Sequence, residues 1–384
     1  MRSIPYSKQS IKAQDIRAVA SILSTDWITQ GPKIEEFEEA IADYCGAKYA
    51  VAVSNGTAAL HLACLAAGLQ KGDEAITTPI SFLATSNAVL FAGAKPVFAD
   101  IDYETANIDP ESVKKHINKK TKAIIPIDFA GLPADMNKIK RLSSRQRLIV
   151  IEDASHALGA AYDRKHKVGS CTDSDMTTFS FHPVKHITTG EGGLITTNDK
   201  ILYERLKSLR SHGVSRSEVI QQKHGAWYYE MKELGMNYRI TDFQCALGLE
   251  QLKRLEFFLR VRERISRTYD KAFQALNEFL KIPAQKMTRG RHARHLYLLR
   301  LKGKRASATR RKLFDHLRAN GIYAQVHYIP IYKQPYYRRL FSSKRIHCPN
   351  AERYYNEVLS LPLFPDLQEK EIQHTIRVVK GFFS

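Results

Sequence analysis

One lysine of this 384-residue chain lies between two strand-like runs, in a stretch whose composition favours a tight turn. The β-branched and aromatic run 177–181 stops before Pro183, Lys185 follows, and a Gly-Glu-Gly-Gly sequence leads into a second run at 194–197. An amine enclosed by such flanks loses hydration, so its pKa falls and the ammonium becomes a nucleophile that can form a Schiff base. Because the chain holds 59 Lys and Arg residues, an ordinary solvated charge is the alternative.

Two further motifs each follow an apolar run. Residues 54–57 (Ser-Asn-Gly-Thr) come after the run 50–53 and open a helix-like segment. Free backbone N–H groups and the helix dipole would face a phosphate there, and a plain helix N-cap is the alternative. Asp153 follows the run 148–151, and His156 comes three residues later. This carboxylate and imidazole could bind a metal, act as an acid–base pair or cap a turn.

Phe82 adds an aromatic ring after a third apolar run, 75–78, where it could belong to the core or contact a cofactor. Together, a phosphate cradle, an acidic strand end, an aromatic ring and an enclosed lysine are the parts that pyridoxal 5′-phosphate requires. Its aldehyde needs an amine, its phosphate needs helix-terminal donors, and its ring nitrogen needs a carboxylate in order to stay protonated. That last hydrogen bond is charge-assisted and contributes about 1.5 to 3 kcal/mol. We therefore predict a site for this cofactor, since a metal site accounts for fewer of these features.

The elements that must position these motifs alternate along the chain. Between residues 48 and 197, short apolar runs end in Gly, Asp, Ser or Pro and amphipathic segments follow them. Strands that are apolar on both faces and alternate with helices indicate a mostly parallel sheet covered by helices, an α/β fold. Ligands of such sheets gather at the carboxyl ends of the strands, where the motifs above fall. The predicted strands are 49–53, 74–78, 96–101, 123–127 and 148–151, and the predicted helices are 57–69, 85–92, 110–117 and 134–142.

A smaller α+β region is expected after this sheet. Helical patterns fill residues 242–276, and a strand-like run at 295–301, a helix near 309–320 and a run at 321–326 follow. The length of the chain suits two domains, and we predict a large domain at 1–250 and a small one at 251–384.

Composition limits the classes of function. The net charge of +20 is spread along the chain without a nucleic-acid-binding motif, so we do not expect a nucleic-acid partner. An anionic small substrate, a membrane-surface contact and a merely cationic exterior remain open. No apolar stretch approaches the roughly 20 residues of a membrane span, and the N-terminus lacks the apolar region of a secretion signal. A cytoplasmic protein is expected, with reduced and widely scattered thiols at Cys45, Cys64, Cys171, Cys245 and Cys348.

Four blocks of the chain, residues 54–60, 152–159, 180–193 and 235–242, resemble the signature blocks of the DegT/DnrJ/EryC1/StrS sugar aminotransferases. That family is a branch of the fold-type I, aspartate-aminotransferase-like enzymes that use pyridoxal phosphate, and the resemblance extends from Tyr6 to about residue 363. It implies that an amino group passes from L-glutamate to a nucleotide-linked keto sugar. Because histidine replaces the lysine in members that are dehydratases or have lost transfer, the lysine of this chain implies transamination.

The resemblance also implies a role for individual residues. Lys185 would bind the cofactor as a Schiff base, Asp153 would pair with the pyridine nitrogen and His156, where glutamine is common, would lie near the ring hydroxyl. Phe82 would stack on the ring. The phosphate would be held by Gly56, Thr57 and Ser180, and by Asn237 of a neighbouring subunit, which makes a homodimer with shared active sites necessary.

A narrower resemblance concerns the substrate. Blocks such as residues 26–31, 77–82 and 324–332 resemble the subfamily that aminates C4 of UDP-linked 4-keto-6-deoxy N-acetyl hexoses in pseudaminic acid biosynthesis. A C3 or dTDP-sugar aminotransferase of the same family is one alternative, and a non-catalytic basic regulatory or nucleic-acid-binding protein is another. The substrate contacts that the resemblance implies are Ser180, Asn237, Tyr6, Asp26, Trp27, Ile28, Thr29, Gln325, Val326, His327 and Tyr328.

Overall fold

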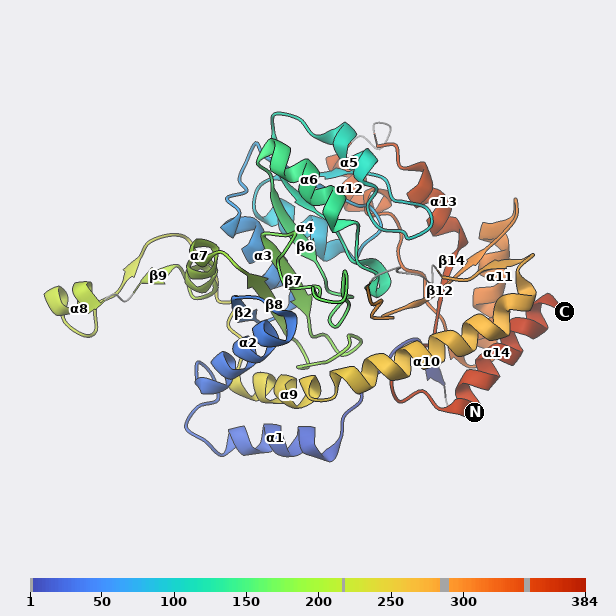
Figure 1. Ribbon diagram of the computed structural model, residues 1–384, viewed down its shortest axis with the longest axis horizontal. Coiled ribbons are helices and arrows are strands. Elements are labelled where there is room, and N and C mark those ends of the chain that lie inside the picture. Colours follow the sequence, from blue (N-terminus) through green and yellow to red (C-terminus); the bar gives the residue numbers. More distant parts are fainter. Residues whose placement is uncertain (1–2, 216–217, 284–289, 342–345) are drawn as a thin grey trace.

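A seven-stranded sheet with the order β2-β8-β7-β6-β5-β3-β4 forms the centre of the computed structural model, which describes residues 3–215, 218–283, 290–341 and 346–384 (Figure 1). Strands β7, β6, β5, β3 and β4 pair in parallel, whereas β8 runs antiparallel to both β2 and β7. The predicted α/β fold with a mostly parallel sheet is confirmed. The strands are β2 (Tyr49–Val53), β3 (Glu74–Thr77), β4 (Lys95–Phe98), β5 (Thr121–Ile125), β6 (Ile149–Asp153), β7 (Met176–Ser180) and β8 (Gly193–Thr197).

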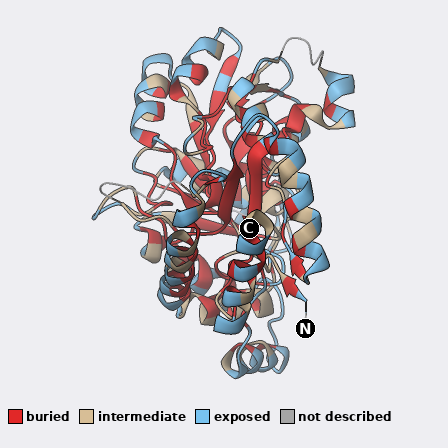
Figure 2. Cartoon of the chain, turned by 90° about the vertical axis from the view of Figure 1, so that its right-hand side faces the viewer, coloured by how far each residue is buried: buried red, intermediate tan, exposed pale blue. Residues whose placement is uncertain are grey.

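Side chains of the sheet alternate between its two faces, and helices cover both. On β6, Ile151 packs into a core with α3, α4 and α7, whereas Val150 packs on the opposite face with α5 and α6. Asp153 therefore shares the face of Ile151, on which α3 lies. Figure 2 shows the buried sheet between these layers, with exposed residues on the outer helix surfaces. The helices are α2 (Pro32–Cys45), α3 (Gly56–Ala66), α4 (Leu83–Phe91), α5 (Pro110–His116), α6 (Met136–Gln146) and α7 (Lys200–Arg210).

The elements predicted between residues 48 and 197 have counterparts whose ends differ by a few residues. The predicted strand 96–101 is too long, because β4 ends at Phe98. Beyond it the carboxylate of Asp100 accepts the backbone N–H groups of Asn350 and Ala351, both at 2.9 Å. These residues begin α13 (Pro349–Glu357), so a contact far away in the sequence ends the strand.

The C-terminal part builds a second core on a three-stranded antiparallel sheet, β11-β12-β14. Helices α10, α11 and α14 enclose this core, so the predicted smaller α+β region is present. Helix α10 contributes both to this core, through Tyr269, and to a cluster packed beside the central sheet, through Phe258. The domain boundary at residue 250 stays a prediction. The elements are α10 (Leu255–Phe273), η2 (Gln274–Leu276), β11 (Leu280–Lys281), β12 (Tyr297–Leu301), α11 (Ala306–Ala319), η3 (Ile331–Lys333), α12 (Pro335–Leu340), β14 (Val358–Leu361) and α14 (Glu369–Phe383).

The N-terminal segment crosses to this second core. Strand β1 (Ile4–Pro5) pairs in parallel with β13 (Ile322–Tyr323), so the predicted run 321–326 forms only a short strand. Helix α1 (Ala13–Leu23) then packs on α9 (Asp242–Leu252). The predicted helical region 242–276 divides into α9 and α10, and no helix of the described residues is long and apolar enough to cross a membrane.

An arm extends from the body of the molecule between residues 211 and 237, at the left of Figure 1. It carries β9 (Val214–Ser215), α8 (Glu218–His224) and β10 (Glu230–Met231), and β9 pairs with β10. Its described residues include Trp227, Met231 and Leu234, whose exposed fractions are 80%, 65% and 76%. Apolar side chains this exposed indicate an interaction surface, which the sequence patterns did not reveal.

Candidate active site

A cavity of about 810 Å³ opens at the carboxyl ends of β2, β3, β5, β6 and β7. Its near wall comes from the turns that follow these strands, and its far wall comes from Tyr6 and residues 325–328. Most of the residues singled out from the sequence therefore meet in one place, at the edge of the sheet where ligands of parallel sheets bind.

Lys185 lines this cavity from the turn after β7. The backbone N–H of Lys185 donates to the carbonyl of His182 at 2.9 Å, and the Ser7 hydroxyl donates to the carbonyl of Val184 at 3.1 Å, so the turn is held on both sides. Burial lowers the pKa of Lys185 to about 8, although the nearby carboxylate of Asp153 opposes part of that effect. At pH 7 about one tenth of such amines are uncharged, which suits a nucleophile.

Asp153 ends β6 with its side chain buried and held by two donors. The Thr85 hydroxyl donates to Oδ2 of Asp153 at 2.7 Å, and the backbone N–H of Ser155 donates to Oδ1 at 3.1 Å. Thr85 in turn exchanges a hydrogen bond of 2.9 Å with Ser81. The carboxylate is thus a fixed acceptor facing the cavity. Thr85 was missed from the sequence, although a hydroxyl in the first turn of the helix after β3 was a usable signal.

The turn from β2 into α3 forms the cradle predicted for a phosphate. Asn55 caps α3 by accepting the N–H of Ala58 at 2.8 Å, so the predicted N-cap is also present. The N–H groups of Gly56 and Thr57 have no acceptor within the helix. A Cβ at Gly56 would lie 2.8 Å from the Cβ of Ser180, so this backbone and that hydroxyl face one small space. The donor set fits a phosphate, and the space depends on glycine.

The far wall carries predicted substrate residues from two distant segments, Tyr6 near the N-terminus and residues 325–328 of the smaller region. The rings of Tyr6 and His327 lie 5.3 Å apart, and Nδ1 of His327 lies 2.7 Å from the Ser360 hydroxyl. Tyr328 approaches His156, with 3.4 Å between its hydroxyl and Nε2. Gln325 and Val326 complete this wall.

Phe82 caps the other side of the opening. Its side chain is 60% exposed and its ring lies 6.3 Å from that of Tyr328, so the alternative that it belongs to the core is wrong. An exposed ring at the mouth of this cavity is free to cover a planar ligand, and the stacking role stays a prediction.

Five predicted residues do not line this cavity in their own chain. Asp26, Trp27, Ile28 and Thr29 are exposed in the loop between α1 and α2, where the carbonyl of Ile28 accepts the N–H of Asp242 at 3.1 Å. Asn237 is also exposed, at the base of the arm. Its neighbour Tyr238, which the sequence did not single out, lines the cavity instead.

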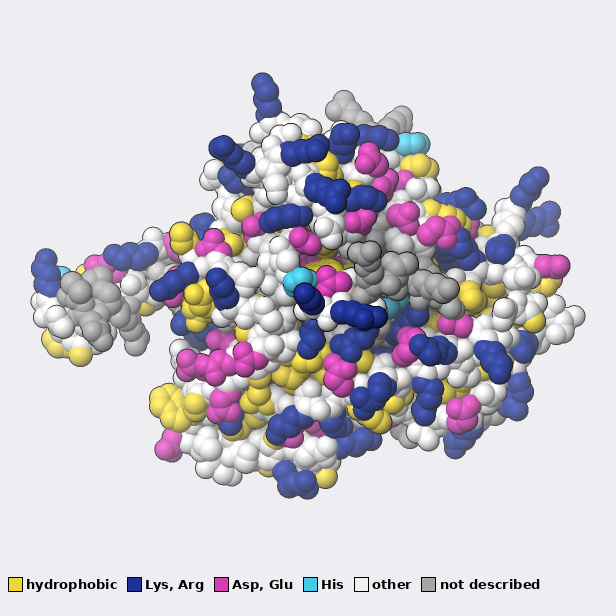
Figure 3. All heavy atoms as spheres, viewed as in Figure 1, with side chains coloured by type: hydrophobic (Ala, Val, Ile, Leu, Met, Phe, Trp, Pro, Cys, Tyr) yellow, Lys and Arg dark blue, Asp and Glu magenta, His cyan; other side chains and the backbone are white. Residues whose placement is uncertain are grey.

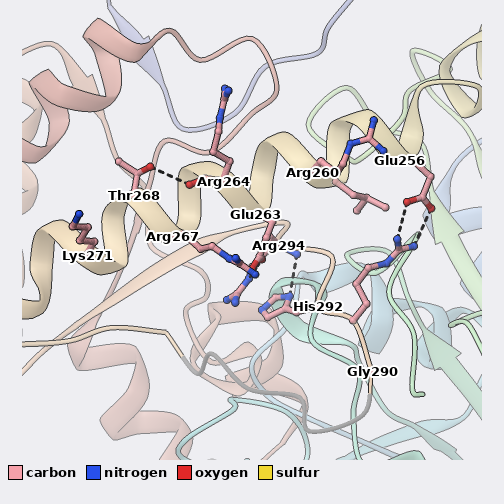
Figure 4. A pocket seen from close by; sticks show the side chains of 12 residues that line it. Glu256, Arg260, Glu263, Arg264, Arg267, Thr268, Lys271, Gly290, His292 and Arg294 are labelled. Carbon is pink, nitrogen blue, oxygen red and sulfur yellow. Dashed lines mark hydrogen bonds and ion pairs between the residues drawn. The ribbon is translucent and has the colours of Figure 1, made fainter. Parts of the chain in front are cut away.

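Charged residues surround a different cavity of about 920 Å³ along α10 (Figure 4). Its carboxylates are already paired. Glu256 pairs with Arg291 at 2.7 Å, and Glu263 pairs with Arg267 at 2.8 Å and with Arg294 at 2.9 Å. The arginine side chains labelled in Figure 4 do not converge on one point, so this cavity does not compete with the first as a reaction site.

The alternative of a metal at Asp153 and His156 finds no further ligand. Within the described ranges, no three His, Cys, Asp or Glu side chains are grouped to hold a metal ion. The two residues also have different partners, because Asp153 accepts from Thr85 whereas Nδ1 of His156 accepts from the backbone of Ala130.

Known proteins of similar sequence and structure point to the same chemistry. A sequence model of the DegT/DnrJ/EryC1/StrS aminotransferase family matches residues 9–380. The UDP-4-amino-4,6-dideoxy-N-acetyl-beta-L-altrosamine transaminase of Campylobacter jejuni serotype O:23/36 is 40% identical over 96% of this chain and 94% of that protein.

Two solved structures share nearly the whole fold. PseC of Helicobacter pylori, an aminotransferase involved in the biosynthesis of pseudoaminic acid, has a TM-score of 0.91 and 34% identity, and the match covers 100% of this chain and 99% of that one. The sugar aminotransferase Spr1654 of Streptococcus pneumoniae in its PLP form has a TM-score of 0.90 and 29% identity over 99% and 98% of the two chains.

Proposed function

The chain belongs to the DegT/DnrJ/EryC1/StrS aminotransferase family and is a PLP-dependent sugar aminotransferase, and we propose that it transfers the amino group of L-glutamate to C4 of a UDP-linked 4-keto-6-deoxy N-acetyl hexose. Such a product would serve pseudaminic acid biosynthesis. The name of the Campylobacter jejuni relative and the biosynthetic role of PseC support this choice of sugar. The observation that carries the proposal is the meeting of Lys185, Asp153 and the Gly56 cradle in one cavity with the far-wall residues 325–328.

The residues of the cavity fit pyridoxal phosphate. Lys185 offers a nucleophilic amine, Asp153 offers a fixed acceptor for a ring N–H, and the cradle leaves room only because Gly56 has no Cβ. When bound, the cofactor supplies an aldehyde that carries the amino group and a ring that withdraws electrons from the reacting carbon. We propose that Gly56, Thr57 and Ser180 hold its phosphate.

The catalytic work of the chain then falls to few groups. Lys185 Nζ would bind the aldehyde carbon and, once released, would move a proton between the substrate carbon that carries the amine and the cofactor carbon that had carried the aldehyde, first as base and then as acid. Asp153 keeps a proton on the ring nitrogen, because a buried carboxylate favours a cationic partner. His156 would donate a hydrogen bond to the oxygen of the ring hydroxyl, and Phe82 would cover the ring face. On the far wall, Tyr6 and residues 325–328 orient the sugar.

The homodimer with shared active sites is also part of the proposal. Among the described residues that line the cavity, Lys185 is the sole Lys or Arg, whereas a UDP sugar and glutamate are both anionic. Further cations must come from outside this lining. The segment that carries the exposed Asn237 and the half-buried Arg239 is a source in a second copy. The exposed apolar arm and Trp27 support such a contact, because a second chain would cover them. Asp26, Ile28 and Thr29 would reach the substrate by the same route.

Other readings of the charge are less well supported. Family membership favours the enzyme over a non-catalytic basic protein. On the face shown in Figure 3, Lys and Arg side chains are interspersed with Asp and Glu instead of forming one basic track. This distribution is unlike a nucleic-acid footprint and suits attraction of small anionic substrates. The cytoplasmic location stays a prediction.

One incubation tests the proposal. The purified protein, pyridoxal phosphate and L-glutamate are mixed with a UDP-linked 4-keto-6-deoxy N-acetyl hexose, and NMR follows the sugar while an enzymatic assay follows 2-oxoglutarate. We expect a 4-amino sugar and 2-oxoglutarate in equal amounts. Formation of 2-oxoglutarate only with a 3-keto or dTDP-linked sugar would favour the C3 or dTDP alternative and contradict the C4 assignment.

A further inference from the structure

His156 is held by a different partner at each ring nitrogen. The backbone N–H of Ala130 points at Nδ1 of His156 at 3.3 Å, and the Tyr328 hydroxyl lies 3.4 Å from Nε2. Because Nδ1 accepts a hydrogen bond, the proton of the neutral ring must be on Nε2. A second proton on Nδ1 would place two N–H groups against each other.

The donor to His156 belongs to a turn of unusual backbone. Within η1 (Phe129–Gly131), Ala130 has a φ of 57°, in the left-handed region that non-glycine residues rarely adopt. Gly131 has a φ of 92°, and a Cβ there would lie 2.8 Å from the carbonyl oxygen of His156. The turn is thus pressed against the loop that carries His156, and its strained residue aims the N–H at the imidazole.

His295 packs against the same ring. The centroids of the His156 and His295 rings lie 4.3 Å apart with 37° between their planes, and His295 is 2% exposed. The backbone N–H of His295 donates to the carbonyl of Ala130 at 2.8 Å, so Ala130 joins both histidines. Nδ1 of His295 is buried and has no hydrogen-bond partner in the described part of the chain. A hydrogen bond from Nδ1 therefore does not account for the place of this ring beside His156.

The surroundings disfavour a charge on these rings. Burial lowers the pKa of His156 well below its usual range, and Lys185, His327 and His186 add to this effect. The pKa of His295 is lowered in the same way by burial and by His156, Lys185, His186 and Arg262. Among the described residues in contact with the ring of His156, Tyr328 supplies a hydroxyl, and no carboxylate makes a hydrogen bond to either ring nitrogen.

We infer that His295 and the Ala130 turn are positioning elements that hold His156 as a neutral imidazole whose Nε2 proton points toward Tyr328 and the cavity. The tautomer of His156 follows from the contacts of its ring, whereas a hydrogen bond from Nε2–H to the hydroxyl of the cofactor ring rests on the proposed function. A donor that stays neutral gives the same hydrogen bond throughout the working pH range. A titrating imidazole would instead add a second proton equilibrium to that of the cofactor.

The tautomer can be read directly by NMR of protein with ¹⁵N-labelled histidine rings, without and with pyridoxal phosphate. The signals of His156 are assigned by their absence in His156→Gln. We expect the neutral Nε2–H tautomer from about pH 6 to about pH 8, unchanged in this range. An Nδ1–H tautomer, or a ring that titrates in this range, would overturn the inference.

Three variants test the part of His295. In His295→Ala the ring of His156 loses its wall, and we expect the pKa of His156 to rise toward its ordinary value, so that its titration moves into the pH series. The absorbance of the loaded enzyme should gain a pH transition at the same value. His295→Phe keeps a ring at this place and should keep the neutral tautomer. The control His166→Ala removes an exposed histidine that is paired with Asp163, and the signals of His156 should titrate in it as they do in wild type.

The possible results separate the two proposals. If the signals of His156 are the same in His295→Ala as in wild type, His295 does not position it. If His295→Ala does not fold, the wild-type tautomer and the spectrum of His295→Phe still test the inference. Loss of the neutral tautomer of His156 in His295→Phe would refute a role of the ring at position 295 as a wall. A failure of the UDP-sugar assay with an intact Nε2–H tautomer would contradict the proposed substrate and leave the positioning inference standing.

Discussion

Gly56 offers a sharp test of the phosphate cradle. A Cβ added there would lie 2.8 Å from Cβ and 3.1 Å from Oγ of Ser180, closer than the ordinary contact of two side chains. The backbone of Gly56 is compatible with alanine, because it starts α3 and its φ is not positive. The collision must therefore be relieved by moving Ser180, whose hydroxyl shares the cradle. Overpacking of this kind costs about 1 to 3 kcal/mol, and the better helix propensity of alanine offsets at most about 1 kcal/mol of it.

The expected effect on the cofactor is larger than the effect on the fold. Displacing the Ser180 hydroxyl would remove the hydrogen bond that we propose it makes to the charged phosphate, about 1.5 to 3 kcal/mol, so Gly56→Ala should weaken binding of pyridoxal phosphate by about 10-fold to 150-fold. Fluorescence titration of the cofactor-free protein measures this affinity. Pyridoxal, which lacks the phosphate, should bind the variant and wild type almost equally.

Two further variants serve as controls. Gly381→Ala also adds a Cβ to a helical glycine, but nothing lies within 4 Å of it, so this variant should bind the cofactor as wild type does. Ser180→Ala keeps the colliding Cβ and removes the hydroxyl. Combining it with Gly56→Ala should weaken binding little beyond Ser180→Ala alone, because both changes act on one hydrogen bond. Wild-type affinity in Gly56→Ala, or an equal loss for pyridoxal, would refute the cradle.

Four other predictions concern the lysine and the dimer. Lys185→Ala should abolish amino transfer, and borohydride reduction of the loaded wild type should attach the cofactor to Lys185 in a mass-spectrometric digest; a label on another lysine contradicts the assignment. Since the pKa of Lys185 is lowered from 10.5 to about 8, the reaction of the cofactor-free protein with pyridoxal should accelerate up to about pH 8 and then level off, and an increase that continues to pH 10 would show an ordinary lysine. Between about pH 8 and pH 10.5, Lys185 is protonated in the unfolded chain but largely neutral in the folded one. The free energy of unfolding of the cofactor-free protein should therefore increase as pH rises through this window, which urea unfolding measures. Mixing Lys185→Ala with Asn237→Ala should restore activity toward about a quarter of wild type, since half of all dimers are then mixed and each mixed dimer carries one intact site of two, and no recovery would argue against shared sites.

The sequence by itself determined the elements and most of the near wall of the site. Short, continuous apolar runs predicted β2, β3 and β6, because strands buried on both faces leave an apolar signature that depends only on neighbouring residues. The motifs at Gly56, Asp153 and Lys185 were recognisable for the same reason. Each lies in a short segment at the end of a strand, and parallel strands bring their ends to one edge.

Only the tertiary structure decided which distant segments meet there. The pairing of β1 with β13 brings Tyr6 to His327, and no local pattern in either strand encodes that partner. Thr85 reaches Asp153 from another element, and Ala130 joins His156 to His295 across more than a hundred residues of chain. Hydrophobic periodicity and capping residues specify local backbone geometry, whereas these contacts depend on how whole elements pack. The exposure of Asp26 to Thr29, away from the cavity of their own chain, follows from the same packing.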